Sequence, residues 1–172
     1  MSCDGLPDAY LEARLAGAID ADVRWQGKDL SCDGMRRPDG KGLRVTFAGA
    51  VGSARLTLVF GVPSLAEGAS ANAVPVNVTL IREGGALYGT RGADKCLLDE
   101  VRQQPLPAAS GPHPARRWRI DARGFCLEPA RAVGGARDAI LVSRFDFRGQ
   151  LARELDPPAP TAPPPPAGAA PR

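Results

Sequence analysis

The sequence has few of the residue types on which most catalytic and metal sites depend. Its 172 residues include a single histidine, and aromatic residues make up 5% of the chain. That histidine, His113, lies between Pro112 and Pro114, where we expect an exposed loop rather than the packing and carboxylate partner that a Ser-His-Asp or Cys-His site requires. No close C-x-x-C pair is present, which argues against a zinc ribbon. We therefore expect no histidine-based catalysis, no metal site and no cofactor.

Long hydrophobic runs are also missing. No apolar run approaches the roughly 18 residues of a membrane-spanning helix, so we expect no transmembrane segment. The start of the chain, residues 1–4, lacks the basic and hydrophobic parts of a signal peptide. The net charge of +3 at pH 7 is small, and aromatic side chains that could stack on bases are scarce, so we expect no nucleic-acid partner.

The four cysteines fall into two pairs of similar separation, Cys3 with Cys32 and Cys96 with Cys126. An even number at such spacings predicts two disulfides, which persist in oxidising compartments. We therefore expect a periplasmic or extracellular protein whose signal peptide is missing from this chain. A lipoprotein anchored at Cys3 is the alternative, although lipidation there would leave one cysteine unpaired.

Hydrophobic periodicity predicts an all-β domain with one short helix. Leu6, Tyr10, Leu11, Leu15 and Ile19 recur at helical spacing and predict a helix over residues 7–19. After Asp20 the period changes to two, which is typical of strands with one buried face. The fold class expected is an antiparallel β-sandwich of eight or nine strands, with a jelly roll or a barrel as alternatives. The expected strands cover residues 23–32, 43–51, 55–62, 74–81, 86–90, 96–102, 116–126 and 139–151. We expect a loop over residues 33–42, and hairpins that join 43–51 to 55–62 and 74–81 to 86–90.

Composition divides the chain into two parts. Residues 1–155 have the material of one disulfide-stapled domain. Residues 156–172 are rich in proline and alanine, have little to bury, and favour an extended polyproline conformation. We expect this segment to be a disordered tail.

One strand carries a basic face. Within residues 116–126, Arg117, Arg119 and Arg123 share one side, while the apolar side chains share the other. Arg144 and Arg148 would extend this surface if the last strand lay alongside. These five arginines are the ligand-binding candidates, and the partners they suit are an anionic glycan, lipopolysaccharide or an acidic protein.

No catalytic residue can be assigned from the sequence. Paired carboxylates hydrolyse glycosidic bonds without histidine, but no short motif selects a pair here. The hypothesis is a secreted or periplasmic bacterial envelope protein that acts as a non-catalytic binding or structural module. A carboxylate-dependent envelope hydrolase acting on glycans, and a basic scaffold for anionic polymers, are the alternatives. The carboxylates considered are Asp94, Asp99, Glu100, Asp121, Glu128 and Asp146.

Overall fold

The fold is antiparallel and almost entirely β, as predicted. The computed structural model describes residue 3 and residues 5–107, 116–134 and 137–153. Its strands form one open sheet of 12 strands. No helix in these described ranges is long and apolar enough to cross a membrane. The elements are β1 (Tyr10–Gly17), β2 (Ala21–Gln26), a short 3-10 helix (Gly27–Asp29), β3 (Ser31–Arg36), β4 (Leu43–Val51), β5 (Ala54–Val62), β6 (Ala71–Pro75), β7 (Asn77–Arg82), β8 (Leu87–Gly89), β9 (Cys96–Leu106), β10 (Arg116–Cys126), β11 (Ala130–Ala132) and β12 (Ala139–Arg153).

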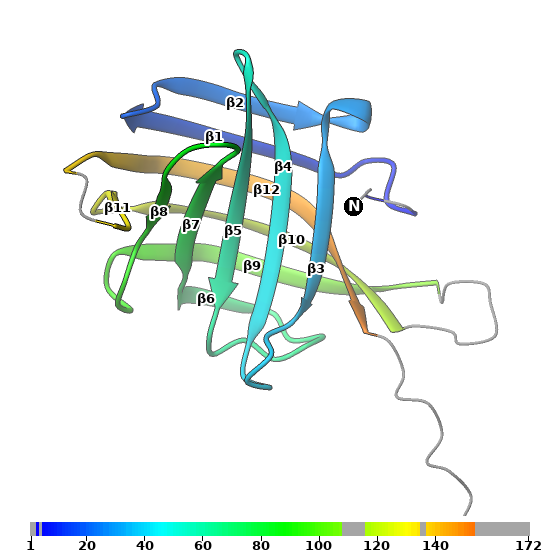
Figure 1. Cartoon of the computed structure of the whole chain (residues 1–172). Coiled ribbons are helices and arrows are strands. Elements are labelled where there is room, and N and C mark those ends of the chain that lie inside the picture. Colours follow the sequence, from blue (N-terminus) through cyan, green and yellow to red (C-terminus); the bar gives the residue numbers. More distant parts are fainter. Residues whose placement is uncertain (1–2, 4, 108–115, 135–136, 154–172) are drawn as a thin grey trace, which may run out of the picture.

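The sheet doubles back on itself into two layers (Figure 1). The front layer has the order β3-β4-β5-β7-β8, and its strands run across those of the back layer, β6-β9-β10-β12-β1-β2. The short strand β11 pairs with β8 on one side and with β12 on the other. Because hydrogen bonding continues through β11, the two separate sheets of a sandwich are not confirmed.

The core lies between the two layers. Phe47 of β4 and Phe60 of β5 meet Phe145 and Phe147 of β12, with inter-layer ring centroids 4.8 to 5.0 Å apart. All four rings are buried. Each large apolar side chain removed from water stabilises the fold by about 1.5 to 3 kcal/mol, so this cluster holds the layers together.

Both predicted disulfides are formed. Cys96 and Cys126 lie opposite each other at the base of the β9–β10 hairpin. Cys3 is joined to Cys32 and ties the N-terminal segment to β3. Disulfides of this kind favour an oxidising, non-cytoplasmic compartment.

The predicted helix over residues 7–19 is wrong. Its centre is β1, in which Leu11, Ala13 and Leu15 point into the core while Glu12 and Arg14 point outward. Because Leu11 and Leu15 are four residues apart, they fit a helical stripe and an alternating strand equally well. Pairing with β12 on one side and β2 on the other satisfies the backbone of β1, and this tertiary context decides for a strand.

Several strand boundaries also differ from expectation. The predicted strand 23–32 is interrupted by the 3-10 helix, and β3 occupies part of the predicted loop. The predicted strand 74–81 divides at Val76, where the chain leaves β9 in the back layer and joins β5 in the front layer. The three-residue strand β11 was not predicted. These differences, together with β1, account for a strand count above the eight or nine expected.

The predicted hairpins are present. Val51 lies opposite Ala54 in the β4–β5 hairpin, and Ile81 lies opposite Leu87 in the β7–β8 hairpin. His113 and the predicted tail, residues 156–172, lie outside the described residues.

Candidate binding face on the back layer

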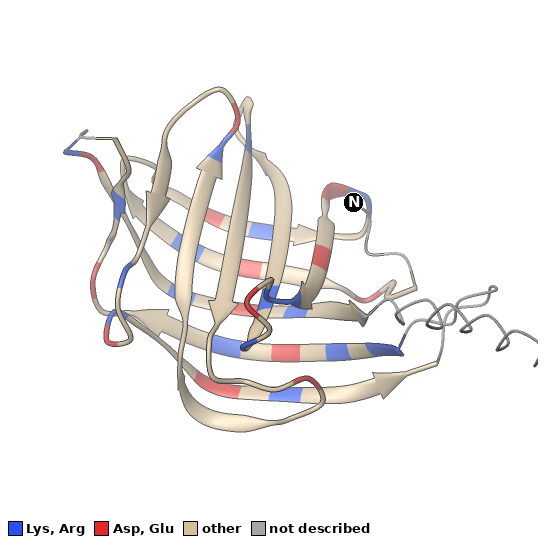
Figure 2. Ribbon diagram, turned by 60° about the horizontal axis from the view of Figure 1, so that its bottom comes forward, with Lys and Arg blue, Asp and Glu red and all other residues tan. Residues whose placement is uncertain are grey.

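Charged side chains are concentrated on one layer of the molecule. Figure 2 shows the back strands striped with both signs of charge, whereas the middle of the front layer is almost free of charge. Strands β5, β7 and β8 contain only Arg55 and Arg82 as charged residues, each at or near a strand end. We call the outer surface of β9, β10, β12, β1 and β2 the charged face.

The structure brings the five predicted arginines together on this face. β10, which carries Arg117, Arg119 and Arg123, pairs with β12, which carries Arg144 and Arg148. The predicted basic surface depended on this pairing of β10 with the last strand. The apolar side of β10 packs inward as expected, with Ile120 buried and Trp118 against the core.

Carboxylates neutralise part of this arginine cluster. Asp121 binds two arginines, with its oxygens 2.9 Å from Nε of Arg119 and 2.6 Å from Nε of Arg148. Arg148 also contacts Asp8 at 2.6 Å through Nη1. The hydrogen bond with Asp121 raises the pKa of Arg148 above its ordinary value. These contacts fix the guanidinium groups in place without neutralising the whole face.

Two further arginines have polar partners. Arg123 lies 3.3 Å from Glu100 on the neighbouring strand β9, and Arg117 donates a hydrogen bond of 2.6 Å to Gln150. The face is therefore mixed in charge rather than uniformly basic.

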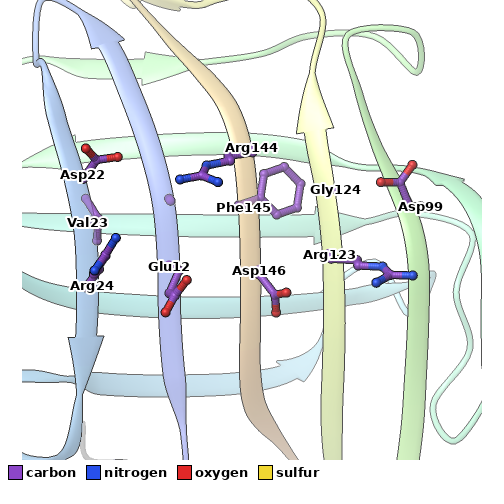
Figure 3. A pocket seen from close by; sticks show the side chains of 11 residues that line it. Glu12, Asp22, Val23, Arg24, Asp99, Arg123, Gly124, Arg144, Phe145 and Asp146 are labelled. Carbon is purple, nitrogen blue, oxygen red and sulfur yellow. The ribbon is translucent and has the colours of Figure 1, made fainter.

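A row of four charged residues crosses the middle of the charged face. Across β2, β1, β12 and β10, the register places Arg24 opposite Glu12, Glu12 opposite Asp146, and Asp146 opposite Arg123. Two carboxylates thus lie side by side with an arginine on each outer side (Figure 3). We call these four residues the central row.

Tyr10 supports the central row from the same strand as Glu12. Its hydroxyl donates a hydrogen bond of 2.7 Å to Oδ1 of Asp146. Burial, and then this bond to a carboxylate, raise the pKa of Tyr10 above its usual range. The guanidinium carbon of Arg148 lies 5.9 Å from the centre of the Tyr10 ring. Tyr10 therefore stays protonated and orients Asp146 at neutral pH.

The central row lines a shallow pocket of about 280 Å³, to which Arg144 also contributes (Figure 3). Two adjoining hollows share Glu12, Arg24, Arg123 or Asp146 with it, so the depression continues along the face. Within the described residues, Glu12, Arg24 and Arg144 have no ion pair or side-chain hydrogen bond. Their charged groups are available to a ligand.

Comparisons of this chain with family models, curated proteins and solved structures find no match. The site must therefore be interpreted from its own geometry. Among the described residues, no group of three or more histidines, cysteines and carboxylates is placed to hold a metal ion.

Sequence reasoning found part of this site and missed part. Of the carboxylates considered, Asp121, Glu100 and Asp146 lie on the charged face, whereas Glu128 pairs with Lys95 away from it. Glu12 and Tyr10 were missed because they were assigned to a helix. The alternation of Leu11, Ala13 and Leu15 was the signal that could have placed them on a strand. Asp99 of β9 also lines this pocket, at a β-bulge where the pairing of β9 with β10 shifts by one residue. The sequence contains no signal for this bulge.

Proposed function

We propose that this protein is a non-catalytic binding module of the bacterial envelope, periplasmic or secreted, and that it binds an acidic glycan across the charged face. The two disulfides support an oxidising location. The lipid-anchor alternative loses support, because the thiol that it needs, that of Cys3, is joined to Cys32.

The central row is the observation that carries this proposal. A glycan presents hydroxyl groups, which donate hydrogen bonds to carboxylates, and an acidic glycan adds anionic groups that arginine binds with charge-assisted bonds. Glu12 and Asp146 supply the acceptors, while Arg24 and Arg144 supply cations without protein partners. The adjoining hollows provide room for an extended chain rather than a single small ligand.

The mixed charge favours an acidic glycan over a simple polyanion. A densely charged polymer would meet the carboxylates of Glu12 and Asp146 as well as the arginines, and like charges repel. Hydroxyl groups between the anionic groups remove this conflict. Among the anionic polymers that a basic scaffold could bind, we therefore favour one that carries both hydroxyl and anionic groups.

The test is retention of the protein on immobilised polysaccharides. We expect binding to an acidic polysaccharide such as polygalacturonate, weaker binding to neutral dextran, and a decrease with salt. Replacing Arg144 or Arg24 with glutamine should weaken binding roughly tenfold, as loss of a bond to a charged group predicts. Arg55→Gln, which removes a positive charge from the front layer, is the matched control.

Two results would overturn the proposal. One is equal retention of the wild-type protein on dextran and polygalacturonate, which would show no use of the arginines. The other is a loss with Arg55→Gln as large as that with Arg144→Gln, which would indicate a response to net charge alone.

A second candidate function rests on the adjacent carboxylates. Glu12 and Asp146 are direct cross-strand neighbours, and glycosidases use two carboxylic groups, one to protonate the leaving oxygen and one to activate water or attack carbon. A hydrolase would release reducing ends from a glycan, and both Glu12→Gln and Asp146→Asn would abolish that release. A binding module releases none, so the wild-type assay separates the two functions.

A further inference from the structure

Three exposed apolar side chains gather at the junction of the two layers, away from the charged face. Ile81, Leu87 and Val133 are 41%, 38% and 48% exposed. Ile81 lies opposite Leu87 in the β7–β8 hairpin, and the amide of Val133 donates a hydrogen bond of 2.7 Å to the carbonyl of Leu87. Leu127 is the other large apolar side chain that is exposed in the described ranges. We call Ile81, Leu87 and Val133 the apolar edge.

A basic pocket adjoins the apolar edge. It has a volume of about 320 Å³ and is lined by Arg91, Lys95 and Arg131 together with Val133, and none of the described residues that line it is a carboxylate. Lys95 pairs with Glu128 at 3.1 Å. Within the described part of the chain, Arg91 and Arg131 have neither an ion pair nor a side-chain hydrogen bond. Their two guanidinium groups are therefore available to an anion.

The strand register joins the pocket to the apolar edge. Arg131 lies opposite Gly89, and the next residues along the same face are Val133 on one side and Leu87 on the other. Residues two apart in a strand point to the same face, so these cationic and apolar groups share one surface. A Cβ at Gly89 would meet nothing within 4 Å, which shows that the space beside Arg131 is open.

The two rows of side chains nearest the apolar edge carry no charge across β4, β5, β7 and β8, although the second row ends at Asp33 in β3. The row that contains the apolar edge runs from Ala48 through Thr57 to Ile81 and Leu87 across β4, β5, β7 and β8. The next row runs from Thr46 through Val59 and Thr79 to Gly89. The apolar edge, with Arg91 and Arg131 beside it, therefore borders an uncharged part of the sheet.

We propose that this surface docks the protein on a membrane that contains anionic phospholipids. A phosphate group would be bound by Arg91 and Arg131 in the basic pocket, as guanidinium groups suit phosphate geometry. The apolar edge would enter the interface between headgroups and acyl chains. A soluble phosphate would use the pocket but leave the apolar edge in water, so the two features together favour a lipid surface. This site is separate from the charged face and does not depend on it.

Vesicle co-sedimentation of the full chain tests the proposal. We expect binding to vesicles of phosphatidylglycerol and phosphatidylcholine, and little binding to phosphatidylcholine alone. Each arginine near an anionic surface contributes about fivefold to partitioning, so Arg91→Gln with Arg131→Gln should reduce it by roughly 25-fold. Leu87→Thr with Val133→Thr keeps β propensity, removes apolar surface, and should reduce partitioning several-fold. Arg44→Gln with Arg55→Gln removes the same charge elsewhere on the front layer and is the control.

Three outcomes would overturn the proposal. Equal sedimentation with both kinds of vesicle would remove the role of the anionic headgroup. A loss with the Arg44 and Arg55 control as large as with Arg91 and Arg131 would indicate a net-charge effect. No effect of the Leu87 and Val133 pair, together with displacement by millimolar inorganic phosphate, would identify a site for a soluble anion instead. Circular dichroism of each variant verifies that a loss of binding is not a loss of fold.

Discussion

Glu12 and Asp146 lie directly opposite each other on β1 and β12, so two carboxylates are neighbours in the middle of the charged face. Like charges in this position are destabilising in antiparallel sheets. Arg24 and Arg123 on the outer sides offset part of the repulsion. The remaining repulsion between the two carboxylates lowers the stability of the fold. Because the fold does not need two carboxylates at these positions, their presence is consistent with a role in binding.

Glu12→Gln should therefore stabilise the protein. Removing one of two opposed charges should raise the free energy of unfolding by about 0.5 kcal/mol at neutral pH and low salt. Asp121→Asn is the matched comparison, because Asp121 binds two arginines, and its replacement should lower stability by about 1 kcal/mol. Urea unfolding of the variants measures both changes. A loss of stability with Glu12→Gln would show that the repulsion is fully compensated.

The Tyr10 hydroxyl predicts a dependence of stability on alkaline pH. Burial and the bond to Asp146 raise the pKa of Tyr10 in the folded state above the value of about 10 in the unfolded chain. The stabilisation is thus fully present below pH 10 and is lost as the pH rises further, because the unfolded state releases the proton first. Tyr10→Phe removes this group, so the stability difference between wild type and variant should shrink above about pH 10. A difference that stays constant from pH 8 to 11 would contradict the assignment.

The Cys96–Cys126 disulfide should make a large contribution to stability. It closes a loop with a sequence separation of 30 residues, for which chain entropy predicts about 3.6 kcal/mol. We expect the variant with both cysteines replaced by alanine to lose about this amount in urea unfolding. The Cys3–Cys32 bond, with a separation of 29 residues, should give a similar value in the same model. An unchanged midpoint after reduction of the wild-type protein would contradict both expectations.

A strand could be predicted correctly where the apolar residues fitted the two-residue period of a strand and did not fit the 3.6-residue period of a helix. In β5, the buried residues Leu56, Leu58 and Phe60 occur at every second position, and both the strand and its hairpin with β4 were predicted correctly. In β1, the spacing of Leu11 and Leu15 is compatible with both periods, and pairing with distant β12 makes the choice. The pattern of residues within β1 contains no information about its pairing with β12.

The sequence could place residues of the candidate site on a shared face only within a single strand. Arg117, Arg119 and Arg123 could be found because residues at alternating positions of a single strand share one face. The central row draws one residue from each of four strands, with Glu12 and Asp146 separated by most of the chain. Its members become neighbours only through register, which depends on turns and core packing that sequence patterns do not specify.

Gly49 lies where a strand of the front layer packs against an aromatic ring of the back layer. A Cβ at Gly49 of β4 would overlap the indole of Trp25 on β2. The same indole donates a hydrogen bond of 2.9 Å from Nε1 to the carbonyl of Ala50, so it cannot move away without losing that bond. Trp25 is buried as a core residue, in agreement with its position in an alternating strand.

Gly49→Ala should therefore destabilise the protein by about 1 to 3 kcal/mol, the range expected for overpacking a close contact. Gly89→Ala is the matched control, since Gly89 also lies in a front-layer strand but its added Cβ would meet nothing within 4 Å. Its effect on urea unfolding should stay within about 0.5 kcal/mol. If Gly49→Ala were as mild as the control, β2 would be free to shift over β4. Arg24 and its end of the central row would then be less firmly positioned than the register implies.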